Sequence, residues 1–264
     1  MTKSGQRTGH CVRAWLWGLA FSLVGMALAQ ADELSVASSG GFAAAFKLLK
    51  PGYEAQSGNQ LSAVWGPSMG ETAGAIPKRL QRGEPIDVVI MVGDALTQLV
   101  AQGQVLPDHA VVLARSRIAM VVKAGAPKPD ISTVQALTQT LLNARSIAYS
   151  DSASGVYLAK VLFARLGVAD KIQAKSRMIP AEPVAQVVAR GEAEIGFQQL
   201  SELLPVPGVD VVGMLPDEAQ QVTLFSAGVV AKSAHQDQAK ALIDYLAAPT
   251  SAALIRQTGL DPAH

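Results

Sequence analysis

Three short segments rich in serine and glycine lie between an apolar run and a helical pattern, at residues 38–41, 67–70 and 150–155. A helix start offers unpaired backbone N–H groups and a partial positive charge, and the two together bind anions. Serine, aspartate and glycine are also ordinary cap and turn residues, so one such segment alone indicates little. Three of them predict an anion-binding site. The expected ligands in these segments are Ser38, Ser39, Gly40, Ser68, Met69, Gly70, Ser152 and Ser154.

Other kinds of site find little support in the sequence. The four histidines are scattered outside these segments without metal-ligand spacing, and the single cysteine is Cys11. The patterns GxGxxG, GxxxxGK[ST] and GxSxG do not occur at a helix start. We therefore expect no metal and no cofactor. If the site is catalytic, its proton carrier is expected to be a carboxylate, a tyrosine or a lysine.

The first 31 residues have the features of a secretory signal peptide. Three basic residues precede an apolar run at residues 14–29, and small residues follow. The run has 16 residues, fewer than the roughly 20 of a membrane-spanning helix. The sequence predicts cleavage near Ala29 or Ala31, export to the periplasm and no stable membrane anchor.

Removal of this segment leaves a slightly acidic chain. Three of the 22 basic residues and none of the 21 acidic residues lie in residues 1–31, so 19 basic and 21 acidic residues remain, a net charge of −2. No basic run remains, and nucleic acid is not an expected partner. We expect a monomer that binds a small anion.

Apolar runs and helical patterns alternate along the rest of the chain. Strands are expected at residues 34–37, 61–65, 87–92, 117–123, 146–149, 177–179, 194–197 and 221–231. Helical patterns separate most of them, and two more close the chain at 238–247 and 251–258. This alternation is typical of α/β proteins with parallel sheets.

Length and chain order favour two α/β lobes with two crossings between them. Lobe 1 is expected to contain residues 32–114 and 221–264, and lobe 2 residues 115–220. A single doubly wound domain with an extra helix pair is the alternative. Two lobes are favoured because chains of more than 200 residues often divide, and ligands commonly bind in the cleft between lobes.

Several motifs resemble the periplasmic molybdate-binding proteins, two-lobed receptors of ABC importers. They are LSVASSGGF, GEPIDVVIMVGDAL, PAEPV, GEAEIGFQQLSEL and ALIDYLAAPTSAALIRQTGL. The resemblance covers nearly the whole chain after the signal segment and implies the Venus-flytrap fold of periplasmic binding proteins. It also implies that Glu182 and Val184 of PAEPV, and Gln198 and Gln199 of the strand-end motif, lie at the site.

The chain departs from the molybdate receptors at the expected site. Gly41 stands where the resemblance implies a serine, and Gln199 stands where it implies a tyrosine. The loop at residues 66–72 is longer, and Arg117 replaces a neutral residue. An arginine in an enlarged site suits an anion with several carboxylates, because guanidinium binds carboxylate in a fixed bidentate geometry. The alternative is that Arg117 is a solvated residue beside Arg115.

A more specific resemblance is to the periplasmic aconitate isomerases, which are built on the same receptor fold. It rests on the ordered segments AIPKRL, VIMVGDAL, AGAPKPDIS, SIAYSDSASGVYL, MIPAEPV and VVARGEAEIGFQQLSEL. It implies interconversion of trans- and cis-aconitate. Two alternatives remain: a non-catalytic receptor for a di- or tricarboxylate, and a receptor for a compact oxyanion such as molybdate. Either would serve an importer.

The implied reaction moves a double bond by an allylic shift. A base removes a methylene proton, negative charge spreads into a neighbouring carboxylate, and a proton returns two carbons away. N–H groups at helix starts stabilise such charge, and a positioned base typically contributes 10²- to 10⁴-fold. The candidate bases are Tyr149, Asp151, Tyr157 and Glu182. The sequence does not choose among them, and helix capping is an equally good role for the two carboxylates.

The departures at Gly41 and Gln199 predict the ligand class. We expect aconitate at about 100 Kd to stabilise the protein by roughly 2.7 kcal/mol, and molybdate and sulfate to stabilise it very little. Thermal melts with each anion measure this. Strong protection by molybdate with none by aconitate would contradict both carboxylate hypotheses.

Overall fold

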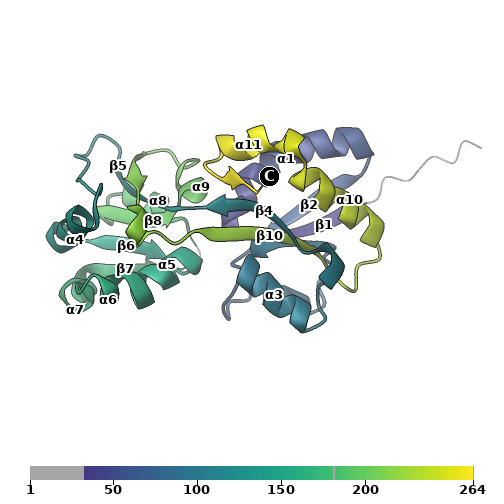
Figure 1. Ribbon diagram of the computed structural model, residues 1–264, viewed down its shortest axis with the longest axis horizontal. Coiled ribbons are helices and arrows are strands. Elements are labelled where there is room, and N and C mark those ends of the chain that lie inside the picture. The colour runs from purple at the N-terminus through teal and green to yellow at the C-terminus, as the bar shows by residue number, and fades with distance from the viewer. Residues whose placement is uncertain (1–32, 181, 264) are drawn as a thin grey trace, which may run out of the picture. The chain divides into compact units, whose positions relative to one another are not determined.

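The computed structural model describes residues 33–180 and 182–263, which form two β-sheets with helices on both faces of each (Figure 1). The predicted signal segment at residues 1–31 lies outside the described residues. The chain crosses between the sheets twice. At the first crossing a single residue, Arg117, connects a strand of the first sheet to a strand of the second sheet. At the second crossing, residues 215–222 lead back to the first sheet.

The first sheet has the strand order β11-β4-β10-β3-β1-β2. Its strands are β1 (Glu33–Ser38), β2 (Gln60–Trp65), β3 (Val88–Val92), β4 (Val111–Ser116), β10 (Thr223–Val229) and β11 (Asp261–Pro262). β1 lies parallel to both β2 and β3, whereas β10 and β4 pair antiparallel. The carboxyl ends of β1, β2 and β3 therefore meet at one edge.

Two apolar cores cover the two faces of this sheet. One core includes Phe42, Phe46 and Leu242 and lies under α1 (Gly40–Ser57), α10 (Gln236–Ala247) and α11 (Ala252–Gln257). The other includes Ile76 and Leu96 and lies under α2 (Ile76–Gln81) and α3 (Gly93–Ala101). Short 3₁₀ turns at Pro107–His109 and Pro249–Ser251 complete the lobe.

The second sheet has the order β7-β6-β8-β5-β9. Its strands are β5 (Ile118–Lys123), β6 (Ile147–Ser150), β7 (Ser176–Ile179), β8 (Ile195–Gln199) and β9 (Val209–Met214). β6 lies parallel to β7 and β8, and β5 pairs antiparallel with β8 and β9. This sheet therefore repeats the mixed arrangement of the first.

Helices also cover both faces of the second sheet. One face carries α4 (Val134–Asn143), α5 (Ala153–Tyr157), α6 (Phe163–Arg165) and α7 (Ala169–Ile172), and the other carries α8 (Val184–Ala189) and α9 (Leu200–Leu203). A π-helical turn at Leu158–Leu162 joins α5 to α6, and 3₁₀ turns occupy Gln173–Lys175 and Asp217–Ala219. Leu158 and Leu162 of this turn are buried, whereas Val161 is exposed.

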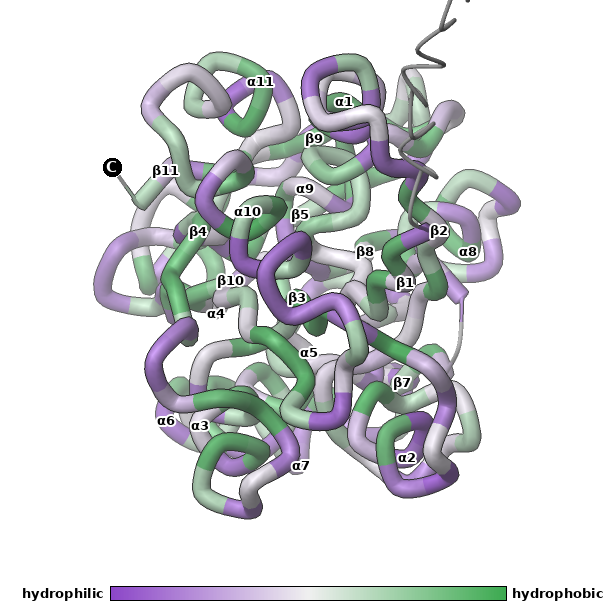
Figure 2. Tube along the Cα trace, turned by 90° about the vertical axis from the view of Figure 1, so that its right-hand side faces the viewer, coloured by the Kyte–Doolittle hydropathy of each residue, from purple (hydrophilic) through white to green (hydrophobic). Residues whose placement is uncertain are grey.

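The helices bury one side and expose the other. In Figure 2, α1, α2 and α11 each carry both hydrophobic and hydrophilic residues along their length. In α1, for example, Phe42, Phe46 and Leu49 are buried, whereas Lys47 is exposed. This spacing of apolar residues on a 3.6-residue period is what allows the helix to pack on the sheet.

The prediction of two α/β lobes with two crossings is confirmed. The expectation of parallel sheets is wrong in part, because β10 pairs antiparallel with β3 and β4, and β5 pairs antiparallel with β8 and β9. The sequence also did not reveal β4, β9 or β11. β9 is half-buried along most of its length and contains a glycine and an aspartate, so it lacks a clear apolar run. The proposed lobe boundaries, 32–114 with 221–264 and 115–220, stay a prediction.

The corner between β6 and α5 leaves no space for a side chain at Gly155, so we expect a substitution there to destabilise the protein. A Cβ at position 155 would overlap the backbone carbonyl of Ser150, which belongs to a strand and cannot easily move. We expect Gly155→Ala to lower the free energy of unfolding by about 1–3 kcal/mol, the usual cost of overpacking. Denaturant unfolding measures it.

The matched control is Gly213→Ala on β9, where the nearest atom to a new Cβ is Ile131 Cδ1 at 3.9 Å. Equal stability of the two variants would show that the corner at Gly155 tolerates a side chain.

Candidate functional site

A pocket of about 590 Å³ is lined by residues of both lobes. Lobe 1 contributes the start of α1, the end of β3 and the loop after β2. Lobe 2 contributes residues 151–153 after β6, residues 182–183, the end of β8 and α9. Of the predicted site residues, those that line the pocket are Ser39, Gly40, Ser68, Asp151, Ser152, Glu182, Gln198 and Gln199. The fold therefore brings together predicted residues from five separate segments.

Backbone hydrogen bonds hold the first two loops at the carboxyl edge of the first sheet. The Ser39 N–H donates to Ile90 O at 2.8 Å, and the Gly66 N–H donates to Ser38 O at 3.1 Å. Ser68 Oγ accepts the Val92 N–H at 2.9 Å, which leaves its hydroxyl hydrogen for another acceptor. Open α/β sheets bind ligands at this edge.

The start of α1 has the properties of an anion site. Ser39 is the N-cap residue, yet its side chain makes no capping hydrogen bond, and the first turn contains no acidic residue. Ser39 is 5% exposed, and its Oγ has no hydrogen-bond partner among the described residues. A buried hydroxyl without a partner is costly, and an anion held by the N–H groups of α1 would satisfy it.

Four other predicted ligands, Ser38, Met69, Gly70 and Arg117, do not line the pocket. Ser38 is fully buried, and its hydroxyl donates to Ser39 O at 3.1 Å. Met69 and Gly70 belong to the same loop as Ser68, but the pocket lining does not include them. Arg117 also lies outside the lining, and its guanidinium pairs with Asp261 at 3.4 Å.

Lys47 is a cation in the pocket that sequence reasoning missed. It lies on α1, and its Nζ stands 5.2 Å from the centre of the Trp65 ring. Its position eight residues after Ser39, two helical turns further along α1, was the available signal. An anion bound at the start of α1 would have this ammonium group as a long-range partner.

The third serine-rich loop forms a network of hydroxyls. Ser150 Oγ lies 2.8 Å from Ser152 Oγ and 3.0 Å from Ser154 Oγ. Ser152 lines the pocket together with Asp151, whereas Ser154 is buried behind them. The loop therefore presents one hydroxyl and one carboxylate to the pocket.

The two predicted tyrosine bases do not line this pocket. Tyr149 packs edge-on against Phe163, with ring centres 5.8 Å apart. The Tyr157 hydroxyl donates to Ala219 O at 3.0 Å and accepts from Arg165 Nη2 at 3.0 Å. Both rings contribute to the core of lobe 2, and their catalytic role stays a prediction.

Glu182 lines the pocket, but its carboxylate is bound elsewhere. Both of its oxygens accept from Arg190, at 3.1 and 3.2 Å. The neighbouring Val184 N–H donates to Gln198 Oε1 at 2.9 Å, which fixes the orientation of the Gln198 amide. The PAEPV motif thus orients a side chain of the site through its backbone.

The two departures from the molybdate receptors have structural partners. A Cβ at position 41 would overlap the ring of Phe225, a residue that lines the pocket, so a serine there would need Phe225 to move. Gln199 is 2% exposed, and its Nε2 donates to Thr223 Oγ1 at 2.9 Å. Both residues therefore pack against side chains at the start of β10.

Glu202 is the second residue that sequence reasoning missed. It lies on α9 and lines the pocket. Burial of its carboxyl group raises the pKa of Glu202 to about 7, with the negative charge of Asp151 raising it further and the hydrogen bonds from Gln198 and the Gln199 backbone opposing the shift. In the sequence it reads as an ordinary helical glutamate, three residues after the end of a strand.

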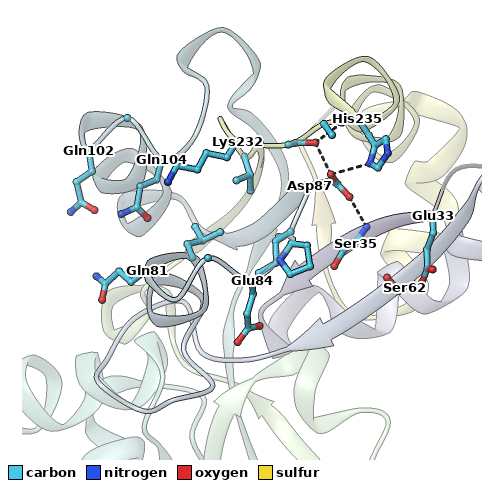
Figure 3. A pocket seen from close by; sticks show the side chains of 18 residues that line it. Glu33, Ser35, Ser62, Gln81, Glu84, Asp87, Gln102, Gln104, Lys232 and His235 are labelled. Carbon is cyan, nitrogen blue, oxygen red and sulfur yellow. Dashed lines mark hydrogen bonds and ion pairs between the residues drawn. The ribbon is translucent and has the colours of Figure 1, made fainter.

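A larger pocket of about 960 Å³ lies at the opposite, amino-terminal side of β1 and β3 (Figure 3). At its centre Asp87 accepts hydrogen bonds from the Ser35 N–H at 2.8 Å and from Ser233 Oγ at 2.6 Å, with His235 Nδ1 at 3.4 Å. These groups satisfy one another, and none of the predicted site residues is there. The amino ends of parallel strands are also not where open α/β sheets bind ligands.

Comparison with known proteins decides the family. Residues 34–261 match the family model described as bacterial extracellular solute-binding protein. The chain belongs to this solute-binding family. Such a match implies export from the cytoplasm. Among the described residues, no helix is long and apolar enough to cross a membrane.

Three relatives of this solute-binding protein are informative. An aconitate isomerase from Pseudomonas sp is 56% identical over 229 residues, 87% of each chain. The molybdate-binding protein ModA of Azotobacter vinelandii is 26% identical over 241 residues, 88% of this chain and 90% of that protein. The solved structure of the Azotobacter vinelandii periplasmic molybdate-binding protein has a TM-score of 0.68 at 22% identity, covering 86% of this chain and 98% of that one. Both resemblances inferred from the sequence, and the two-lobed binding-protein fold, are confirmed.

We expect the replacement of Ser39 by alanine and the replacement of Ser68 by alanine to have different effects. Ser39→Ala should leave the stability of the unliganded protein nearly unchanged and weaken anion binding by about 1–3 kcal/mol, because its hydroxyl has no other partner. Ser68→Ala should lower both stability and affinity, because it also removes the acceptor of the Val92 N–H. Calorimetric titration with aconitate and denaturant unfolding measure the two effects. Normal affinity in Ser39→Ala would place the anion elsewhere.

Proposed function

We propose that this solute-binding protein is a periplasmic aconitate isomerase, which interconverts trans- and cis-aconitate by an allylic proton shift. The observation that carries the proposal is the 56% identity to an aconitate isomerase across both lobes. At this identity, over 87% of both chains, the fold and most of the residues around the cleft are expected to be shared.

The pocket has the chemistry that this reaction needs. The N–H groups of α1, the Ser39 hydroxyl and Lys47 are suited to holding the carboxylates of a tricarboxylate. The same donors stabilise the negative charge that spreads into a substrate carboxylate when a methylene proton leaves. Side chains that can exchange a proton are also present, because Asp151, Glu182 and Glu202 all line the pocket.

Among the bases predicted from the sequence, Asp151 has the best position. It lines the pocket beside Ser152, whereas Tyr149 and Tyr157 pack in the core of lobe 2 and Glu182 is paired with Arg190. We retain all four as candidates for mutagenesis and rank Asp151 first. The proposed contacts to the substrate are made by Ser39, Gly40, Ser68, Ser152, Gln198 and Gln199.

The second candidate function is a non-catalytic receptor for a tricarboxylate or an oxyanion, serving an ABC-type importer. It is favoured by membership of a solute-binding family and by the likeness to the molybdate-binding protein. Under either function the chain is exported to the periplasm after cleavage near Ala29 or Ala31, and it acts as a monomer with two lobes closing on the ligand.

Turnover separates the two functions. We expect the purified mature protein to convert trans-aconitate into cis-aconitate, with the product identified by nuclear magnetic resonance and the rate followed by ultraviolet absorbance. Catalytic amounts of protein should bring both isomers to the same equilibrium ratio from either side. Protection against thermal unfolding by aconitate without any conversion would establish the receptor instead.

A further inference from the structure

We propose that Glu202 carries the proton between the two carbons of the substrate, an assignment that rests on the proposed isomerase function. The motif GEAEIGFQQLSEL contains Glu202, but nothing in the sequence distinguishes it from an ordinary helical glutamate. Three features of the structure support the assignment: the position of the carboxylate, the hydrogen-bond donors beside it and the charges around it.

The carboxylate of Glu202 lies against the first turn of α1. A Cβ at position 40 would overlap Glu202 Oε1, so the carboxylate packs directly on Gly40. Next to it, Ser201 Oγ donates to Gly41 O at 2.7 Å, which joins α9 of lobe 2 to α1 of lobe 1. A substrate carboxylate held by the N–H groups of α1 therefore has Glu202 as its immediate neighbour.

Two hydrogen-bond donors stand beside the carboxylate. The Gln198 amide and the Gln199 backbone N–H both lower the pKa of Glu202, against the effect of burial, and the other end of the Gln198 amide is fixed by the Val184 N–H at 2.9 Å. Glu202 lies three residues after the N-cap residue Gln199, the position from which a glutamate can accept the N–H of the N-cap residue. Capping alone would not need the Gln198 amide or a place in the pocket.

The charges around Glu202 suit a base that works near neutral pH. The residue as a whole is half-buried, but its carboxyl group is surrounded by protein, and this burial raises the pKa of Glu202 to about 7. Asp151 raises it further, and Lys47 and Glu182 are the other charged side chains in the pocket lining. A base with a pKa near the working pH is present in both forms and transfers protons efficiently in both directions.

The proton transfer balances without another reactant. The ionised carboxylate of Glu202 takes a proton from the methylene carbon of trans-aconitate, and the electron pair of that C–H bond forms a new double bond to the central carbon. The π electron pair of the old double bond moves onto the vinylic carbon. Negative charge moves through the three-carbon unit into the terminal carboxylate, near the donors of α1. The protonated Glu202 then returns the proton to the carbon that was vinylic, so the double bond has moved and the carboxylate is regenerated.

The decisive variant is Glu202→Gln, with Glu218→Gln on the exposed surface as the matched control. We expect Glu202→Gln to lower kcat for trans-aconitate at least about 10²-fold while aconitate still raises its melting temperature. Glu218→Gln should match the wild type in both measurements. A smaller loss of kcat in a folded, aconitate-binding Glu202→Gln protein overturns the assignment but leaves the isomerase function intact. Absence of turnover in the wild type overturns the isomerase function itself.

The pH profile tests the assignment without relying on the folding of that variant. Glu202 is active as a base only when ionised, so wild-type kcat/KM should rise with pH up to about 7 and then level off. Asp151→Asn removes a negative charge that raises the pKa of Glu202, so the inflection should move to lower pH. Ionisation of the substrate is common to both proteins and does not shift between them. An inflection that stays in place overturns the assignment, because a capping role predicts no such shift.

Discussion

The packing of α9 against the first turn of α1 is the contact on which the site depends. It brings lobe 2 to the carboxyl edge of the first sheet, at a helix start that has glycine at positions 40 and 41. At position 40 a side chain would overlap the Glu202 carboxylate, and at position 41 it would overlap the Phe225 ring. The hydrogen bond from Ser201 Oγ to Gly41 O fixes the register of the two helices. The helix start is therefore both a structural junction and the proposed anion-binding surface.

At this junction the acidic side chains of the pocket would repel an anionic substrate, and the proposed reaction uses this arrangement of charges. The pocket has to receive a polyanion, yet three acidic side chains line it. Arg190 neutralises Glu182, and burial together with Asp151 favours the protonated form of Glu202. A raised pKa means that the buried carboxyl group favours folding at low pH, and that this contribution is lost as the pH rises through about 7. This arrangement of charges therefore keeps a proton available on Glu202, next to the place where the substrate is expected to bind.

Sequence patterns predicted the parts of the fold that have strong local signals. β3 is a continuous apolar run, and the helix predicted at residues 238–247 corresponds to α10, Gln236–Ala247. β9 was missed because an aspartate and a glycine interrupt its apolar residues, and it depends on pairing with β5. β4 was missed although residues 111–114 form a short apolar run. At the site, Ser39 and Asp151 were found from their loops. Glu202 was missed, because its place beside α1 depends on a helix–helix contact between residues 160 positions apart. Lys47 was missed although its spacing from Ser39 along α1 was available in the sequence.

The most direct test of this account is a crystal structure of the protein with trans-aconitate bound. The account predicts that one ligand carboxylate contacts Ser39 and the N–H groups at the start of α1, with the methylene carbon about 3–3.5 Å from a Glu202 oxygen, the separation of a reactive geometry. Aconitate bound instead in the pocket around Asp87, or bound between the lobes with its methylene carbon away from Glu202, would contradict it.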